Sequence, residues 1–233
     1  MGRTGQDRCA ALGRLTRMPT TAVTVETMDR WLRGCAVAIA EQRDFLTQLD
    51  AAIGDADHGA NMTRGFAAVQ VKLDDLDGGV PPGKLLIEAG STLVSTVGGA
   101  SGPLWGSGLR KAGRRLGDAE QIEPEALVEA LDAALAAIVE LGAAERGDKT
   151  MVDALAPAID TLRAALADGK TLEDALADAR TAAEEGMRAT VPMVARKGRA
   201  SYLGDRSVGH QDPGATSAAI VVAALERAVN EAP

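Results

Sequence analysis

The chain has 233 residues, of which 46% are hydrophobic and 2% aromatic, and its formal net charge is −8 at pH 7. This length suffices for one domain with its own core, while the negative charge excludes broad attraction to nucleic acid or to an acidic membrane surface. The apolar content is mostly Ala, Leu and Val, and no apolar run approaches the roughly 20 residues of a membrane-spanning helix. Because alanine favours helices and lets them pack closely, the composition predicts an all-α fold.

The beginning of the chain lacks the pattern of a folded element and the apolar stretch of a secretory signal. We expect residues 1–20 to be a disordered extension, with Met18 as an alternative translation start, and residues 21–233 to form one helical domain. Cys9 and Cys35 make neither a disulfide framework nor a CxxC metal site, which favours a cytoplasmic location.

Helical periodicity begins at Thr24, a residue type that caps helix N-termini, and recurs through most of the chain. The expected helices cover residues 24–39, 43–50, 62–73, 85–97, 124–141, 151–167, 172–191 and 218–229. Four polar, mostly glycine- and aspartate-rich loops interrupt them, at residues 54–61, 98–108, 142–150 and 195–217. These loops carry the residues that point to chemistry.

The first loop brings three carboxylates together, from Asp50, Asp55 and Asp57, around a turn at Gly54. Hard oxygen donors in this arrangement suit Mg²⁺, and a cation would relieve the repulsion between the carboxylates. Solvated loop residues and helix caps are the alternative explanation. An EF-hand is excluded, because the twelfth position from Asp55 is Phe66 and not the required glutamate.

The second loop, GGASGPLWGSG at residues 98–108, consists largely of small residues. Without side chains in the way, backbone N–H groups there can approach an anion, although such runs also form simple tight turns. A P-loop is excluded, since the nearest match, from Gly78 to Lys84, is followed by Leu85 where Ser or Thr should stand.

The third loop leads into the start of a helix, and the fourth loop contains a cluster of cations. Asp148 in GDKT is expected to cap the following helix. Arg196, Lys197 and Arg199 lie close together in an otherwise acidic protein. Such a concentration favours contact with phosphate over random surface charge.

Four motifs together resemble one family, the L subunit of dihydroxyacetone kinase and the equivalent C-terminal domain of single-chain ATP-dependent kinases. The matching segments are IGDADHGANMTRGF (53–66), TVGGASGPL (96–104), GDKTMVDAL (147–155) and RKGRASYLGDRSVGHQDPGATS (196–217). The similarity runs from about Met28 to the end of the chain.

This resemblance implies an antiparallel eight-helix barrel with a nucleotide in the loops at one end. It implies that Asp50, Asp55 and Asp57 hold two Mg²⁺ ions that bridge the phosphates of ADP or ATP. Expected nucleotide contacts are His58, Gly59, Ala60, Asn61, Ala100, Ser101, Gly142, Met151, Arg199, Asp212, Pro213 and Gly214. Arg199 can add positive charge near the transferred group and is the expected catalytic residue.

The resemblance also implies partners. The sugar would be held as a hemiaminal on a histidine of a separate K subunit. In one version ADP stays bound and is rephosphorylated by a phosphohistidine carrier, the M subunit; in another, free ATP exchanges and the acceptor is a four-carbon ketose or a fatty acid on a partner protein. A non-catalytic regulatory module and a homodimer are further possibilities, whereas nucleic acid and membrane partners are not expected.

Overall fold

The computed structural model describes residues 22–76 and 79–231, so the expected extension at residues 1–20 lies outside the described residues. Helices dominate the described chain, which confirms the all-α prediction. The elements are β1 (Val23–Thr24), α1 (Val25–Glu41), α2 (Arg43–Ile53), α3 (His58–Asp74), α4 (Pro82–Thr96), α5 (Ser101–Leu116), β2 (Gln121–Ile122), α6 (Pro124–Gly142), α7 (Val152–Ala167), α8 (Leu172–Ala189), the 3-10 helix η1 (Arg199–Ser207) and α9 (Pro213–Asn230).

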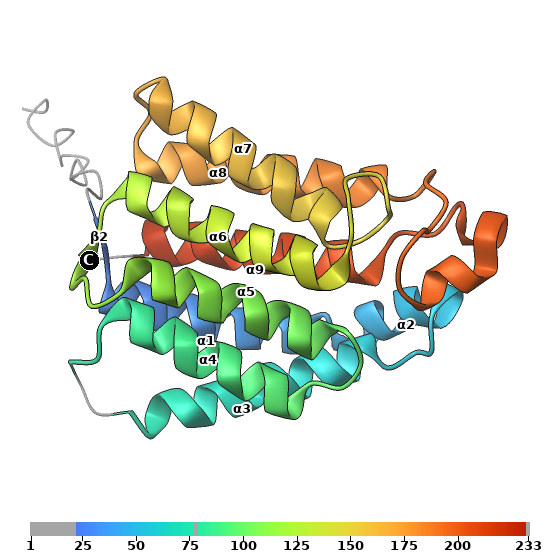
Figure 1. The fold of residues 1–233 in the computed structure, drawn as a ribbon, viewed down its shortest axis with the longest axis horizontal. Coiled ribbons are helices and arrows are strands. Elements are labelled where there is room, and N and C mark those ends of the chain that lie inside the picture. The colour runs from blue at the N-terminus through green and yellow to red at the C-terminus, as the bar shows by residue number, and fades with distance from the viewer. Residues whose placement is uncertain (1–21, 77–78, 232–233) are drawn as a thin grey trace, which may run out of the picture.

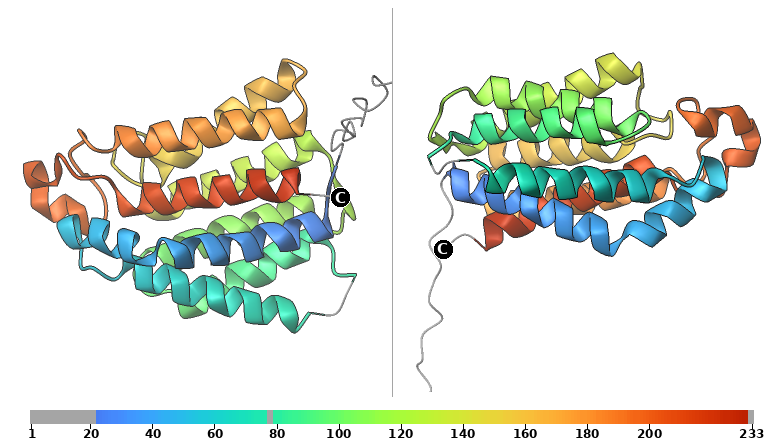
Figure 2. Two further views of the ribbon diagram at one scale, coloured as in Figure 1. Left: turned by 180° about the vertical axis from the view of Figure 1, so that it is seen from behind. Right: turned by 90° about the horizontal axis from the view of Figure 1, so that it is seen from below.

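Eight of these helices close into a barrel, as expected. In order around the ring, α1 packs on α3, followed by α4, α5, α6, α7, α8 and α9, and α9 returns to α1. Neighbouring helices run in opposite directions (Figures 1 and 2). The short α2 follows α1 directly and packs outside this order, against α3.

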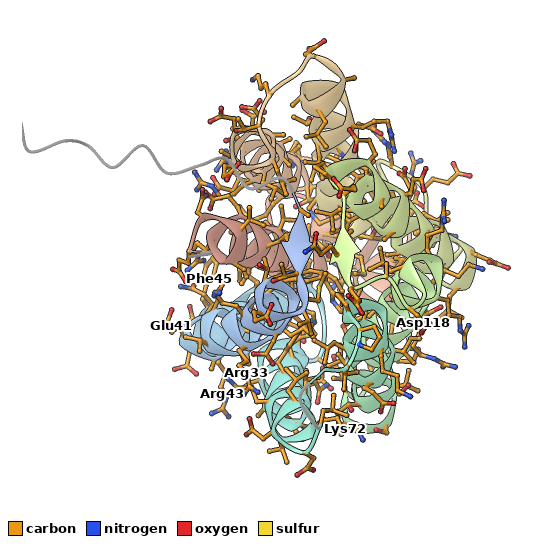
Figure 3. All side chains as sticks on the ribbon, turned by 90° about the vertical axis from the view of Figure 1, so that its left-hand side faces the viewer. Arg33, Glu41, Arg43, Phe45, Lys72 and Asp118 are labelled. Carbon is orange, nitrogen blue, oxygen red and sulfur yellow. The ribbon has the colours of Figure 1, made fainter. Side chains whose placement is uncertain are left out.

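The alternating direction of the helices places every second connection at the same end of the barrel. The α2–α3, α4–α5, α6–α7 and α8–α9 connections all lie at the right-hand end in Figure 1. The opposite end carries the other three connections and the antiparallel pair β1–β2, in which Val23 pairs with Ile122. Figure 3 looks onto that opposite end. The directions of the helices therefore place the four polar loops, which carry the candidate site residues, at the same end of the barrel.

The inside of the ring is a continuous apolar core. Helix α1 illustrates why the sequence folds this way, since Met28, Leu32 and Ile39 recur at helical spacing and are buried. Burying each such side chain contributes about 1.5–3 kcal/mol. The indole N–H of Trp31 donates a hydrogen bond of 3.0 Å to the Val221 carbonyl and so ties α1 to α9. Among the described residues, no helix has the length and apolar character to cross a bilayer.

The glycine-rich residues 101–108 were expected as a loop but form the first half of α5. Their glycines serve close helix packing. A Cβ at Gly106 would lie 2.6 Å from the Gly90 carbonyl oxygen of α4, and one at Gly113 would lie 2.3 Å from that of Gly83. Glycine therefore lets the backbones of α4 and α5 approach, and this packing outweighs the low helix propensity of glycine.

Two helices begin earlier than the periodicity predicts, because distant or flanking carboxylates cap them. Helix α3 begins at His58 rather than at residue 62, with the Asp50 carboxylate accepting the N–H of His58 at 3.1 Å. Helix α9 begins at Pro213 rather than at residue 218, where Asp212 accepts the N–H of Ala215 at 2.6 Å.

The expected capping role of Asp148 is wrong. Its carboxylate accepts the N–H of Glu145 at 2.8 Å inside the loop, and α7 begins only at Val152. The N–H of Thr150 is instead bonded at 2.8 Å by Asp153, a residue of the first turn of α7.

Candidate functional site

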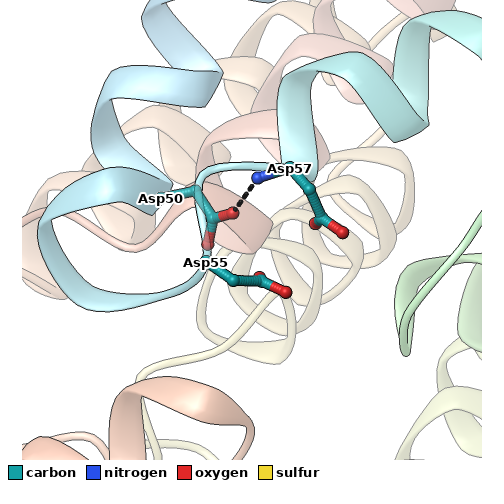
Figure 4. A group of neighbouring side chains, drawn as sticks. All are labelled: Asp50, Asp55 and Asp57. Atoms are coloured by element: carbon teal, nitrogen blue, oxygen red, sulfur yellow. Dashed lines mark hydrogen bonds between the residues drawn. The ribbon is translucent and has the colours of Figure 1, made fainter.

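Three aspartates form an acidic cluster where α2 ends and α3 begins. Ligand atoms of Asp50, Asp55 and Asp57 lie within 4.8 Å of one another. Figure 4 shows the carboxylates of Asp55 and Asp57 reaching into the same space beside Asp50. One oxygen of Asp50 accepts the N–H groups of Asp57, at 2.8 Å, and His58, at 3.1 Å, and this fixes the carboxylate in place.

The backbone of this loop is shaped to bring the carboxylates together. A Cβ at Gly54 would lie 2.0 Å from Oδ1 of Asp50, so only glycine allows the chain to turn so closely over that carboxylate. Ala56, between the other two aspartates, has a left-handed φ of 62°. This conformation costs an alanine about 1–2 kcal/mol, strain that is typical of functional loops.

Arg199 reaches the acidic cluster from the far part of the chain. Its Nε lies 2.9 Å from Oδ2 of Asp55, although the side chain is 68% exposed. The predicted metal ligands and the predicted catalytic residue thus meet in the fold. Closely spaced carboxylate oxygens that can share a cation with phosphate are the ligand type that Mg²⁺ uses, so this site fits the ion.

A cavity of about 440 Å³ opens beside the acidic cluster, within the usual range for small-molecule sites. Residues from all four loops line it. Of the expected site residues, those on its wall are Asp50, Asp55, Asp57, His58, Asn61, Ala100, Ser101, Gly142, Met151, Arg199, Asp212, Pro213 and Gly214.

Gly59 and Ala60 are not among the lining residues. A Cβ at Gly59 would lie 2.1 Å from the Arg43 carbonyl oxygen and 2.5 Å from the Thr47 hydroxyl, so this glycine lets α3 pack against α2. Gly59 thereby supports the loop that carries the aspartates without facing the cavity.

The cavity combines an apolar wall with the starts of four helices. Leu104, Ile138, Leu141 and Met151 provide apolar surface suited to a flat aromatic ring. The N-terminal turns of α3, α5, α7 and α9 also contribute lining residues. Because first-turn N–H groups have no partner within their helix, such ends bind anions, and the site fits a nucleotide whose phosphates face the aspartates.

His58 connects two of these helix starts. Its Nε2 lies 3.0 Å from the Ser217 hydroxyl, which itself donates to the Gly214 carbonyl, and its Nδ1 lies 3.2 Å from the Ser101 hydroxyl. Ser217 therefore accepts from Nε2–H, and Ser101 donates to Nδ1. Burial lowers the pKa of His58, although Asp50 and Asp57 oppose the shift, and the neutral ring fits this chain of hydrogen bonds.

Two features of the site could not be read from the motifs. Burial raises the pKa of Asp212 to about 7 at the start of α9. Lys149, one residue from the misassigned cap Asp148, is buried, and desolvation lowers the pKa of its ammonium. In the sequence, Lys149 is a lysine within a loop motif. Nothing local distinguishes it from a cation on the surface.

Comparisons with known proteins agree with this architecture. Residues 52–227 match the DAK2 domain. The chain is 42% identical over 202 residues to the PEP-dependent dihydroxyacetone kinase, ADP-binding subunit DhaL, of Escherichia coli K12, covering 86% of this chain and 95% of that one. It is 39% identical over 202 residues to the L-erythrulose 1-kinase of Mycolicibacterium smegmatis, covering 86% of this chain and 34% of that enzyme.

A solved structure shares the fold. It is the dihydroxyacetone kinase from C. freundii in complex with AMP-PNP and Mg²⁺, with a TM-score of 0.65 and 26% identity over 97% of this chain and 37% of that one. The match to the DAK2 domain spans most of the chain, and the Escherichia coli relative is similar over nearly its full length. The chain therefore belongs to the DAK2 domain family, together with the ADP-binding subunits of dihydroxyacetone kinases.

Proposed function

We propose that this chain is the nucleotide-carrying subunit of a dihydroxyacetone kinase. It binds ADP or ATP with Mg²⁺ and transfers the terminal phosphoryl group to dihydroxyacetone, or a similar small ketose, held on a partner K subunit. The acidic cluster of Asp50, Asp55 and Asp57 beside a cavity of nucleotide-compatible shape carries this proposal. The similarity to the ADP-binding subunit of Escherichia coli and to the C. freundii kinase in complex with AMP-PNP and Mg²⁺ supports it.

In this proposal each part of the site has a separate task. Asp50, Asp55 and Asp57 would hold two Mg²⁺ ions, which when bound neutralise charge on the phosphates and on the transferring phosphoryl group. The N-terminal turns at Ser101 and Gly214 orient the phosphates through backbone N–H groups. Arg199 supplies a fixed positive charge at the edge of the acidic cluster, where charge develops during transfer.

The apolar wall and the small residues account for the remaining contacts. Met151 and Gly142 lie on the wall of the cavity and would face the adenine, with Ala100 and Pro213 next to the phosphate-binding turns. Excluding water from this surface strengthens the electrostatic interactions with the phosphates. Gly59 and Ala60 do not line the cavity, and Gly59 would support these contacts by letting α3 pack against α2.

The donor and the location belong to the same proposal. We infer that ADP stays on the chain and is rephosphorylated there by a phosphohistidine carrier, the M subunit, which the PEP-dependent name of the Escherichia coli relative supports. The reaction would take place in the cytoplasm, with residues 21–233 acting as one domain and residues 1–20 as an extension.

A second candidate is an ATP-dependent kinase that acts on a four-carbon ketose with exchangeable nucleotide. The similarity to the L-erythrulose 1-kinase of Mycolicibacterium smegmatis favours it. Dialysis separates the two, because a resident coenzyme stays with the purified protein, whereas an exchangeable nucleotide is lost.

The decisive test is a reconstituted transfer assay. The purified chain is mixed with candidate K and M subunits and dihydroxyacetone, and phosphate is followed from phosphoenolpyruvate or from ATP. We expect transfer from phosphoenolpyruvate that requires this chain and Mg²⁺. Transfer from ATP alone would support the second candidate. Both would be refuted if the purified protein carries no nucleotide and calorimetry also detects no binding of ADP in the presence of Mg²⁺.

A further inference from the structure

The ammonium of Lys149 lies at the centre of the long segment that joins α8 to α9. This segment spans residues 190–212 and includes η1. The Lys149 side chain is buried and comes from a different loop, the one between α6 and α7. Its Nζ donates to four backbone carbonyl oxygens, those of Thr190 at 2.8 Å, Met193 at 3.2 Å, Ser207 at 2.9 Å and His210 at 2.5 Å.

These contacts leave the ammonium no capacity for a phosphate. A lysine has three N–H donors, and four carbonyl oxygens already surround the nitrogen. Although Lys149 lines the cavity, its hydrogen bonds are directed into the protein. The residue therefore differs from the cations expected to contact the ligand.

The backbone at Lys149 has a conformation that is unfavourable for a residue with a side chain. Its φ of 63° is left-handed, a conformation that glycine adopts without cost and that a lysine adopts only with strain. Neighbouring Gly147 is also left-handed, with a φ of 90°. A lysine at such a position is consistent with a role for the ammonium that outweighs the backbone cost.

The segment held by this ammonium carries two of the expected site residues, Arg199 and Asp212. Arg199 is 68% exposed, so packing of its own side chain does not place it on Asp55. Its position depends on the path of the backbone. Besides this ammonium, the Arg199–Asp55 ion pair and the Asp212 carboxylate at the start of α9, the path is held by bonds between neutral groups. Examples are the N–H of Ala195 bonded to the Ser207 hydroxyl at 2.8 Å and the N–H of Arg196 bonded to the Asp148 carbonyl at 3.0 Å.

We propose that Lys149 is a positioning residue. It holds the α8–α9 segment against the loop between α6 and α7 and thereby places Arg199 at the acidic cluster. Charge-assisted hydrogen bonds are about twice as strong as neutral ones, so one ammonium shared by four carbonyls holds this segment more strongly than any one of its neutral hydrogen bonds. The catalytic consequence rests on the proposed function, whereas the structural role does not.

The structural role can be tested without any ligand, by limited proteolysis. Trypsin cleaves after Arg196, Lys197, Arg199 and Arg206, all within the held segment. In Lys149→Met we expect cleavage there to be faster by on the order of tenfold or more, because the loss of charged hydrogen bonds favours local opening. Lys170→Met, which alters an exposed lysine between α7 and α8, should match the wild type.

A second variant separates the ammonium from the backbone conformation. Lys149→Gly relieves the left-handed strain and so protects against global misfolding, but it also removes the ammonium. Circular dichroism checks that helix content is retained. If this variant or a folded Lys149→Met keeps its 196–206 segment as resistant to trypsin as the wild type, the proposal is overturned.

The catalytic consequence predicts a particular split in kinetics. Lys149→Met should lower the transfer rate at saturating nucleotide by about tenfold or more, while the affinity for ADP with Mg²⁺ changes less, since the aspartates belong to another loop. Equal losses of rate and affinity would contradict placement of Arg199. If wild-type protein binds no nucleotide, the proposed function fails, but the proteolysis result still decides the role of Lys149.

Discussion

The two ends of the barrel are built from the same helices but differ in what they bury. Thr27, near β1, is the one buried polar or charged residue of the described chain that lies away from the site end. The others belong to the site loops or to the adjoining helix turns: Asp50, His58, Asn61, Asp148, Lys149, Asp153, Thr190, Ser207, Asp212, Thr216 and Ser217. Burying such groups costs free energy unless they are paired, so the site end carries polar groups that stability alone does not require.

Backbone strain follows the same division. At the opposite end the left-handed positions of the described chain are glycines, namely Gly79, Gly117 and Gly169. At the site end three left-handed positions carry side chains, Ala56, Ala143 and Lys149. Within residues 22–76 and 79–231, left-handed residues with side chains and buried charged groups thus lie at one end. One end of the barrel stabilises the ring, and the other carries the candidate site.

Removing a carboxylate from the acidic cluster at the site end should lower the rate of phosphoryl transfer more than any other change. We expect Asp55→Ala and Asp57→Ala each to lower phosphoryl transfer by about a thousandfold or more, because charge neutralisation by a bound cation contributes several kcal/mol. Helix content should stay nearly unchanged. The measurement pairs the reconstituted transfer assay with circular dichroism, and Asp168→Ala at the opposite end serves as the control. Full activity in either variant would refute the metal assignment.

Removing Arg199 should have the next largest effect. Arg199→Gln loses the charge next to Asp55, and we expect transfer to fall by at least about a hundredfold while ADP still binds. Arg206→Gln changes an exposed arginine of the same 3-10 helix that does not line the cavity, and it should leave the rate near that of the wild type. Similar losses in both variants would mean that the net charge of η1 matters rather than the position of Arg199.

Two glycine substitutions should have opposite effects on the free energy of unfolding. Gly59→Ala places a Cβ against the backbone of α2 and should reduce the free energy of unfolding by about 1–3 kcal/mol. In Gly34→Ala the nearest atom, on Ala224, lies 3.9 Å away, so the higher helix propensity of alanine should stabilise by up to about 1 kcal/mol. Thermal unfolding measures both, and a stabilising Gly59→Ala would contradict the tight contact between α2 and α3.

The smallest expected effect is the change in the free energy of unfolding with pH that Asp212 causes. Burial raises the pKa of this carboxyl from 3.8 to about 7, so between these values the folded protein binds a proton that the unfolded chain releases. The free energy of unfolding should therefore decrease as pH rises through this window, and the penalty should be complete above about pH 7. Asp212→Asn remains neutral and keeps an acceptor for the cap of α9.

We expect Asp212→Asn to unfold at the same temperature as the wild type near pH 4 and at a higher temperature near pH 8, without nucleotide or Mg²⁺. Melting curves across this range test the difference between the two proteins, which cancels the titration of other groups. Parallel curves for the two proteins would show that Asp212 is already charged at low pH.

Much of the helical pattern was predictable, because apolar residues at three- and four-residue spacing report directly on buried helix faces. Helix α6 was expected over residues 124–141 and covers Pro124–Gly142. Two of the errors occur where contacts between separate helices decide the outcome, whereas the start of α9 and the wrong cap at Asp148 depend on near neighbours. The glycines of α5 indicate a loop until the backbone of α4 is known to lie against them, and α3 begins at His58 because Asp50 caps it from the preceding helix.

By itself the sequence determined the all-helical class, the approximate places of the four connections that carry the site, and the acidic residues at its start, since these depend on local periodicity and residue chemistry. Only the tertiary structure decided which side chains meet. The alternating helix directions place four connections at one end, the α8–α9 segment brings Arg199 to Asp55, and Lys149 is buried among the carbonyls of a segment far along the chain. Such contacts depend on the closure of the ring, which no local pattern encodes.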